Sequence, residues 1–286
     1  MPGIAPDTLQ DETIETSRQL TAQNGTDPPL RAAVLSRELI RPGGLWQQIR
    51  VVEVTGSTNA DLLAEAAAGA AGGCVLIAET QTAGRGRLGR HWVSPPHTSL
   101  AFSVLLRPDD LPPARRSWIP LLAGLAVASA LRGYAAVDAR LKWPNDVLVG
   151  AAKVAGILAE QHRDAVVVGV GINVTLRRED LPTAAATSLL LENATGLDRE
   201  DLLGAVLHEL EHRYLAEAAA RDADDSGLRA EYLRRCATIG QQVRVELPGG
   251  RSLTGIAADV DTGGRLVVRT PDGVTAVSAG DVVHVR

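Results

Sequence analysis

Cysteine, long apolar runs and targeting signals are scarce in this chain of 286 residues. Its two cysteines, Cys74 and Cys236, are too few for a disulfide framework, which favours a reducing compartment. The longest apolar run, residues 118–131, is shorter than the roughly 20 residues that a membrane-spanning helix needs. The N-terminal region lacks the basic start and apolar middle of a signal peptide. We therefore expect a cytoplasmic protein that makes no contact with a membrane.

Lysine is nearly absent. Of the 29 basic residues, only Lys142 and Lys153 are lysines, and the other 27 are arginines. A lysine that persists against such a bias is a candidate for a task that needs a compact charge on a flexible stem. Chance survival at the surface is the alternative interpretation for both lysines.

The charge and motif content exclude several classes of protein. A net charge of -5 argues against general nucleic-acid coating and against a polybasic membrane anchor. The sequence contains neither a G-x-x-x-x-G-K-[ST] P-loop nor a G-x-S-x-G nucleophile elbow. Any use of ATP must therefore depend on another phosphate-binding device.

Three segments differ in their patterns. Residues 1–44 are polar and predict a largely disordered tail, with room for a short helix over 31–40 but not for a helix-turn-helix domain. Residues 45–237 mix strand-like and helical runs without strict alternation, which predicts an α+β fold with a mixed α/β layer. Residues 238–286 contain short β-rich runs separated by glycine-containing turns, which predicts a small antiparallel barrel or sandwich.

Residues 84–90 (GRGRLGR) form a loop between two predicted core strands. The glycines permit close approach of the backbone to a ligand. The arginines repel one another unless an anion such as a phosphate or carboxylate joins them. We therefore predict an anion-binding loop, and the alternatives are a flexible solvated loop or an RNA-binding segment.

Two further motifs lie at predicted strands. In residues 142–146 (KWPND) a strand delivers the lysine and then turns, and open sheets hold ligands at strand ends. Residues 169–173 (GVGIN) resemble a dinucleotide fingerprint but lack its third glycine and its following helix. Their glycines favour close approach of a ligand or strand, and Asn173 is a candidate to read an adenine edge. An ordinary polar turn and a glycine-bearing core strand are the alternatives.

Residues 208–212 (HELEH) match the helical zinc-protease pattern H-E-x-x-H. Helical periodicity places both histidines opposite an apolar face that includes Leu203, Leu207 and Leu210, and therefore toward water. A zinc protease needs this face to line a cleft and to meet a third ligand. Glu231 is conceivable as that ligand, but nothing selects it, and we expect no metal site of this kind.

The chain resembles biotin protein ligases, and the resemblance covers about residues 45–286. Five runs carry it in the family's order: 57–59 (STN), 81–90 (QTAGRGRLGR), 142–146 (KWPND), 153–158 (KVAGIL) and 169–173 (GVGIN). The resemblance implies a mixed α/β catalytic domain and a small SH3-like β-barrel. It also implies a two-step reaction. Biotin and Mg-ATP give biotinyl-5′-AMP and pyrophosphate, and a lysine of a biotin carboxyl carrier protein then attacks the adenylate and releases AMP.

The resemblance also assigns roles to individual residues. Lys153 matches the lysine that bridges the biotin carboxylate and the α-phosphate, and Asp146 matches a position for the metal or for the incoming amine. Arg85 and Arg87 match the loop that closes over the adenylate. The residues expected to bind biotin are Ser57, Thr58, Asn59, Gln81, Gly84, Arg85, Gly86, Arg87 and Lys153. Those expected near the nucleotide are Arg90, Trp92, Lys142, Asn145 and Asn173.

Two rival functions remain open at this point. Lipoate ligases share the catalytic architecture, but lipoate has no ureido group, so the polar set around Gln81 favours biotin. A non-catalytic module that binds biotinyl-adenylate is the second rival, and the presence of both lysines argues against it. The resemblance further implies a carboxylase carrier as protein partner and a monomer or weak homodimer. Some members of the family carry an N-terminal DNA-binding domain, but this chain has only a polar tail there and a net charge of -5, so we expect no nucleic-acid partner.

Overall fold

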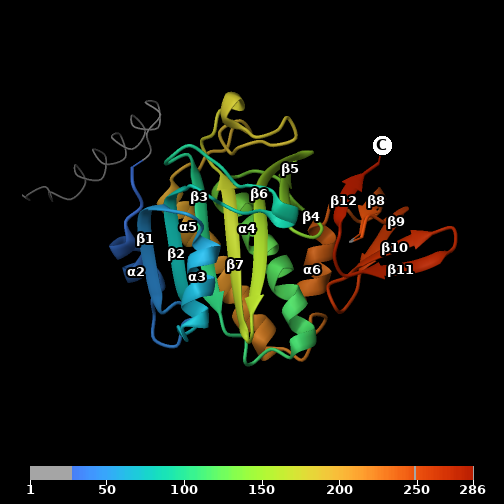
Figure 1. Ribbon diagram of the computed structural model, residues 1–286, viewed down its shortest axis with the longest axis horizontal. Coiled ribbons are helices and arrows are strands. Elements are labelled where there is room, and N and C mark those ends of the chain that lie inside the picture. The colour runs from blue at the N-terminus through green and yellow to red at the C-terminus, as the bar shows by residue number, and fades with distance from the viewer. Residues whose placement is uncertain (1–27, 248, 286) are drawn as a thin grey trace, which may run out of the picture.

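The computed structural model describes residues 28–247 and 249–285, so most of the expected tail, residues 1–27, lies outside the described residues. A seven-stranded sheet dominates the molecule (Figure 1). In sheet order its strands are β1 Gln48–Thr55, β2 Cys74–Gln81, β3 Ser99–Leu106, β7 Ala165–Asn173, β6 Ala152–His162, β5 Asp146–Val149 and β4 Ala139–Lys142. Strands β1 and β2 pair in parallel, and the other neighbours pair antiparallel. The expected mixed α/β fold is confirmed.

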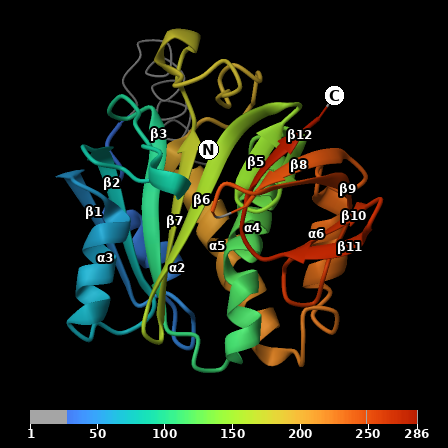
Figure 2. The ribbon, with the colours of Figure 1, turned by 45° about the vertical axis from the view of Figure 1, so that its right-hand side comes forward.

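Helices cover both faces of this sheet (Figure 1, Figure 2). Helices α2 (Ala32–Leu39), α4 (Ile119–Tyr134) and α5 (Arg199–Ala219) contribute to the main apolar core on one face. Helix α3 (Thr58–Ala67) packs on the opposite face through a smaller apolar cluster that includes Leu62. None of the helices in the described part of the chain has the length and apolar character needed to cross a bilayer.

Strand β7 divides its side chains between these two faces, because successive residues of a strand point to opposite sides. Val166, Val168, Val170 and Ile172 join the main core. The alternate positions face α3. There Val167 joins the smaller cluster, whereas Gly169, Gly171 and Asn173 line a cavity. Every residue of β7 is buried, so the sequence of this strand shows no polar alternation that would reveal its two faces.

Residues 28–44 are packed against the sheet rather than disordered, and helix α2 lies where a short helix was expected over 31–40. Three leucines of this segment are buried: Leu30, Leu35 and Leu39. The backbone N–H of Leu30 also donates to the buried carboxylate of Glu79 at 2.6 Å. Widely spaced leucines in a polar segment give a weak helical signal, and long-range contacts with α5 and β1 supply the stabilisation.

The C-terminal part forms a five-stranded antiparallel sheet, whose shape agrees broadly with the expected SH3-like unit. In sheet order its strands are β11 Gly273–Val277, β10 Leu266–Thr270, β9 Ser252–Val260, β8 Gln242–Glu246 and β12 Asp281–His284. Strands β11 and β12 are its edges, so the sheet is open rather than a closed barrel. Helix α6 (Leu228–Arg235) lies between the two sheets and contacts β4 and β9. The indole N–H of Trp143 donates to the carbonyl of Gly264 at 3.1 Å and joins the two parts.

Candidate active site

The predicted site residues converge on a cavity of about 900 Å³ on the α3 side of the large sheet. Of those residues, the following line it: Ser57, Thr58, Asn59, Gln81, Arg85, Gly86, Arg87, Arg90, Trp92, Lys142, Asn145, Asp146, Lys153 and Asn173. Gly84 is the exception, since it does not line the cavity. A Cβ atom on Gly84 would lie 2.3 Å from the carbonyl oxygen of Trp92, so only glycine fits there.

One end of the cavity is polar and uncharged, and it forms where α3 begins beside the end of β2. Ser57 caps α3, because its side chain accepts a hydrogen bond from the backbone N–H of Ala60. The backbone N–H of Thr58 donates to Gln81 Oε1 at 2.9 Å, which fixes the Gln81 side chain against the helix. Hydroxyl and amide groups without net charge suit a neutral ligand group that has both donors and acceptors.

Asn59 forms part of the wall, and protein atoms occupy both its donors and its acceptor. Its Nδ2 group donates to the carbonyl of Leu158 at 3.1 Å and to Glu160 Oε2 at 2.8 Å. Its Oδ1 accepts from Ser103 Oγ at 2.6 Å. A Cβ atom on Gly169 would lie 2.2 Å from Asn59 Oδ1, so this glycine makes room for the asparagine. These contacts favour a role for Asn59 in shaping the polar end.

The three arginines of the arginine-glycine loop (residues 84–90) point to three different protein partners. Arg85 pairs with Glu160 at 3.1 Å. Arg87 donates to Asn145 Oδ1 and to the carbonyl of Gly280, each at 3.2 Å. Arg90 forms an ion pair with Asp281 of the C-terminal sheet. These contacts hold the three positive charges apart. Protein groups therefore relieve part of the repulsion between the arginines, and a bound anion is not the sole means of doing so.

Burial distinguishes Arg87 from its neighbours. Desolvation lowers the pKa of its guanidinium, and the nearby carboxylates of Asp281 and Asp146 oppose that shift. An arginine stays charged even when it is partly desolvated, because the guanidinium does not lose its proton in proteins. Arg87 therefore places a weakly hydrated, permanent positive charge at the cavity wall.

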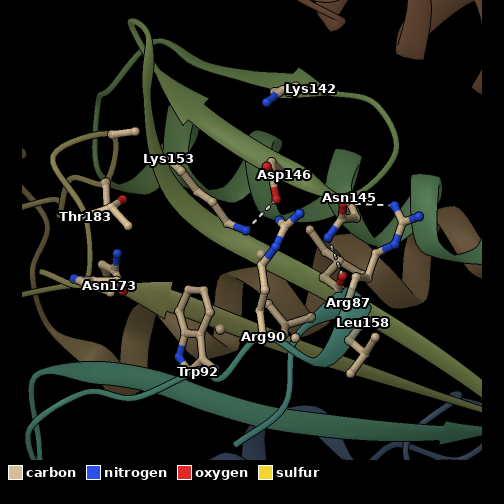
Figure 3. A pocket seen from close by; sticks show the side chains of 18 of the residues that line it. Arg87, Arg90, Trp92, Lys142, Asn145, Asp146, Lys153, Leu158, Asn173 and Thr183 are labelled. Atoms are coloured by element: carbon tan, nitrogen blue, oxygen red, sulfur yellow. Dashed lines mark hydrogen bonds and ion pairs between the residues drawn. The ribbon is translucent and has the colours of Figure 1, made fainter. Parts of the chain in front are cut away.

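Lys153 and Asp146 form the charged centre of the cavity. Lys153 Nζ lies 2.5 Å from Asp146 Oδ1, and Figure 3 shows the two side chains pointing toward each other above Trp92. Backbone hydrogen bonds of 2.8 Å with Ala185 and Thr187 fix the strand at Lys153. The pair presents one cation and one carboxylate to the same space. It therefore suits a ligand that carries anionic groups and a coordinated divalent cation.

Trp92 covers two glycines of the sheet. A Cβ atom on Gly171 would lie 2.2 Å from its Cε2 atom, and one on Gly156 would lie 3.2 Å from its Cζ3 atom. The Lys153 ammonium lies 5.9 Å from the centroid of the indole ring. The indole Nε1 is buried and has no hydrogen-bond partner among the described residues. Gly171 of the GVGIN motif and Gly156 of the KVAGIL run therefore admit the side chain of Trp92 rather than another strand.

Lys142 and Asn173 lie at the edge of this arrangement. Lys142 ends β4, as the interpretation of residues 142–146 as a strand and turn predicted, and it pairs in register with Asp146 of β5. Burial, followed by the charge of Lys142, lowers the pKa of His284. The Asn173 amide donates to the carbonyl of Thr187 at 2.9 Å and so holds the segment at Thr187 against the end of β7. The contacts of Asn173 therefore support the shape of the cavity beside Lys153.

Sequence reasoning missed several polar residues at the cavity. Four line it, namely His91, Thr183, Gln241 and His284. Ser103 and Glu160 lie beside it and contact its wall. Ser103 is fully buried in a strand that is otherwise apolar except for its first residue, and an isolated buried serine was the available signal. Glu160 lies on β6 two positions beyond the KVAGIL run. No local pattern marks Glu160, because its partners Asn59 and Arg85 are distant in sequence.

The H-E-x-x-H motif lies on α5 and faces away from the cavity, as its periodicity predicted. Both His208 and His212 are exposed, whereas Glu209 and Glu231 form ion pairs with Arg213 at 3.0 and 2.6 Å. Among the described residues, no group of three His, Cys, Asp or Glu side chains is placed to hold a metal ion.

Comparison with known proteins identifies two regions of the chain. Residues 51–176 match the Biotin/lipoate A/B protein ligase family, and residues 238–285 match the Biotin protein ligase C terminal domain. The chain is 46% identical to the biotin–acetyl-CoA-carboxylase ligase of Mycobacterium tuberculosis, over 93% of this chain and 100% of that protein. It is 34% identical to the corresponding ligase of Paracoccus denitrificans, over 80% of this chain and 97% of that protein.

A solved structure gives the same result. The biotin protein ligase of Aquifex aeolicus in complex with biotin and ATP superposes with a TM-score of 0.71 at 28% sequence identity. The match covers 84% of this chain and 100% of that chain. Sequence similarity over nearly the whole of a curated relative and the shared architecture lead to one conclusion. This chain belongs to the biotin protein ligase family.

Proposed function

We propose that this chain forms biotinyl-5′-AMP from biotin and ATP and transfers the biotinyl group to a lysine of a biotin carboxyl carrier protein. The observation that carries the proposal is the composition of one cavity. It combines an uncharged polar end at Ser57, Thr58 and Gln81 with the Lys153–Asp146 pair and an arginine-rich loop. These parts suit the neutral ureido ring, the reacting carboxylate and phosphate, and the remaining phosphates.

Lys153 would assist the first step electrostatically. The biotin carboxylate attacks the α-phosphorus of ATP and displaces pyrophosphate, so two anions must approach each other. The compact ammonium group on a flexible stem offsets that repulsion and the charge that develops in the transition state. This requirement for a compact, flexible charge explains why a lysine is present at position 153 in a chain whose other basic residues are almost all arginines.

Asp146 fits a role toward Mg²⁺, which is commonly bound through one or two carboxylates together with substrate phosphates. The carboxylate lines the cavity beside Lys153, so Asp146 is the residue that would hold the cation. When bound, Mg²⁺ supplies charge neutralisation on the phosphates. A position beside Lys153 also allows Asp146 to orient the incoming amine in the second step.

The second step requires no nucleophile from this chain, because the carrier lysine attacks the biotinyl carbonyl and AMP leaves. The protein's contribution is then positioning, charge stabilisation and exclusion of water from a reactive mixed anhydride. The arginine-glycine loop is suited to that exclusion, since Arg87 and Arg90 fasten it to Asn145 and Asp281. We further propose that the protein acts as a monomer or weak homodimer and does not bind nucleic acid.

The test is incubation of the purified protein with Mg-ATP and an equal mixture of biotin and lipoate, without a carrier. Mass spectrometry then identifies the bound small molecules. Biotinyl-AMP alone is the expected result. Lipoyl-AMP would assign the chain to lipoate ligation, and the absence of both adenylates would support a binding module without catalysis. Addition of a carrier domain then tests the transfer step.

Gly171→Ala is expected to lower the rate of adenylate formation by about 10²-fold, because the new methyl group displaces Trp92 from the cavity wall. The rate of biotin-dependent pyrophosphate release measures this effect. Gly204→Ala on α5 is the matched control, since a Cβ atom there meets nothing within 4 Å. A wild-type rate for Gly171→Ala as well as for the control would show that adenylate formation does not depend on the position of Trp92 over Gly171.

His208→Ala is expected to leave both half-reactions unchanged, because His208 is exposed on α5 and does not line the cavity. Biotin transfer to the carrier and the metal content of the purified protein are the measurements. A large loss of activity together with stoichiometric zinc in the wild-type protein would contradict this expectation.

A further inference from the structure

Glu160 connects the polar end of the cavity with the arginine-glycine loop. Its Oε2 atom accepts from Asn59 Nδ2 at 2.8 Å and from Arg85 Nη2 at 3.1 Å. Asn59 belongs to the first turn of α3, and Arg85 belongs to the loop that borders the cavity. One carboxylate oxygen therefore joins two walls that are far apart in the sequence.

The Asn59 side of this connection is rigid. Asn59 is 4% exposed, and its amide also contacts Ser103 and the carbonyl of Leu158. Ser103 Oγ in turn lies 2.7 Å from Thr58 Oγ1. Gly169 leaves no space for Asn59 to turn, since even a methyl group there would overlap its Oδ1 atom. A buried network with satisfied partners fixes its members more firmly than isolated pairs do.

The Arg85 side of the connection is more exposed to solvent. The Arg85 side chain is 43% exposed, whereas that of Glu160 is 28% exposed. The neighbouring arginines of the loop contact other elements, namely Asn145 and the C-terminal sheet. Among the three arginine contacts of the loop, the Arg85–Glu160 pair is therefore the one directed toward the α3 wall.

We propose that Glu160 is a positioning residue that couples the polar end of the cavity to closure of the arginine-glycine loop. The inference rests on the proposed function, because the loop retains the adenylate in that reaction. Glu160 does not line the cavity, so it is a positioning residue rather than a catalytic one. It holds Arg85, and with it the loop, in register with the wall that carries Thr58 and Asn59. Loss of this contact releases the loop without removing any group that contacts the reacting atoms.

Two substitutions separate the two contacts of Glu160. Glu160→Gln keeps a carbonyl acceptor for Asn59 but removes the charge that binds Arg85, whereas Glu160→Ala removes both contacts. We expect Glu160→Gln to speed release of biotinyl-AMP on the order of tenfold and to leave biotin affinity nearly unchanged. Glu160→Ala is expected to speed release by a similar factor and also to weaken biotin binding. The readouts are the adenylate dissociation rate and the biotin dissociation constant.

A double-mutant cycle tests the coupling directly. If Glu160 acts through Arg85, then Glu160→Gln combined with Arg85→Ala releases the adenylate no faster than Arg85→Ala alone. Multiplicative effects would overturn the proposal. Cleavage of the loop by trypsin, which cuts after arginine, should also become faster in Glu160→Gln and return toward the wild-type rate when the adenylate is bound.

Glu65→Gln is the matched control. Glu65, like Glu160, forms an ion pair with an arginine, in this case Arg50 at 2.7 Å. Both side chains of this pair are partly exposed, and neither residue lines the cavity. Its substitution should change neither release nor cleavage, and thermal unfolding of all variants reports any general loss of stability. If wild-type protein makes no adenylate, the proposed function fails. If it makes adenylate and both Glu160 variants retain it as wild type does, only this inference fails.

Discussion

Lys153→Ala should lower the rate of biotinyl-AMP formation by about 10²–10³-fold, the usual cost of removing one electrostatic stabiliser of a transition state. The substitution removes the ammonium group that lies 2.5 Å from Asp146 and leaves that carboxylate without its partner in the cavity. An uncompensated carboxylate then repels the carboxylate and phosphate of the substrates. Biotin-dependent exchange of pyrophosphate into ATP measures this step without the carrier.

Lys153→Arg is the informative companion variant. It keeps the positive charge, but a planar guanidinium is larger and has a different donor geometry. Gly156 is already close to the lysine, because a Cβ atom there would lie 3.0 Å from Lys153 Nζ. We therefore expect Lys153→Arg to recover only a minor part of the activity. Rates within threefold of wild type for Lys153→Ala would exclude the proposed role.

Arg87→Ala should speed the release of biotinyl-AMP by about tenfold or more and should affect the intrinsic rate of its formation less. The guanidinium joins the loop to Asn145 and to the carbonyl of Gly280, and charged hydrogen bonds in a partly buried site are among the stronger ones. Their loss frees the loop and exposes the mixed anhydride to water. Rapid dilution of the preformed complex, followed over time, gives the dissociation rate.

Arg221→Ala provides the control for removing a guanidinium. Arg221 pairs with Asp225 at 2.9 Å, is 87% exposed and does not line the cavity. Its substitution should leave the dissociation rate unchanged, since exposed ion pairs contribute little. An Arg87→Ala protein that retains the adenylate as long as wild type would contradict a closing role for the loop.

Local patterns were sufficient for several parts of the fold. Turn chemistry in residues 142–146 correctly predicted a strand that delivers Lys142 and a turn directly after it. The turn occupies residues 143–145, so Asp146, expected within the turn, begins the next strand. Apolar character on nearly all sides predicted α4 as a buried helix, and eleven of its residues are buried. Helical periodicity on α5 correctly placed His208 and His212 at the surface. In each case neighbouring residues in the chain carry the signal.

Other features depended on contacts between distant residues. The packing of residues 28–44 could not be predicted, because its buried leucines are stabilised by α5 and β1 rather than by local propensity. Glu160 was missed because the contacts that give it a role are with Asn59 and Arg85, which are distant in sequence. The partners of the three loop arginines could not be predicted either. A run of like charges in the sequence indicates that partners are needed, but it does not say which residues they are.

By itself the sequence determined the class of fold, the order of the motifs and the family, because strand and helix periods and short motifs are local properties. Tertiary structure decided which face of β7 carries the site, since a strand buried on both faces shows no alternation. It also decided that glycines at 169 and 171 make room for Asn59 and Trp92. Close packing of this kind exists only once separate elements meet, so the geometry of the cavity belongs to the fold and not to any single motif.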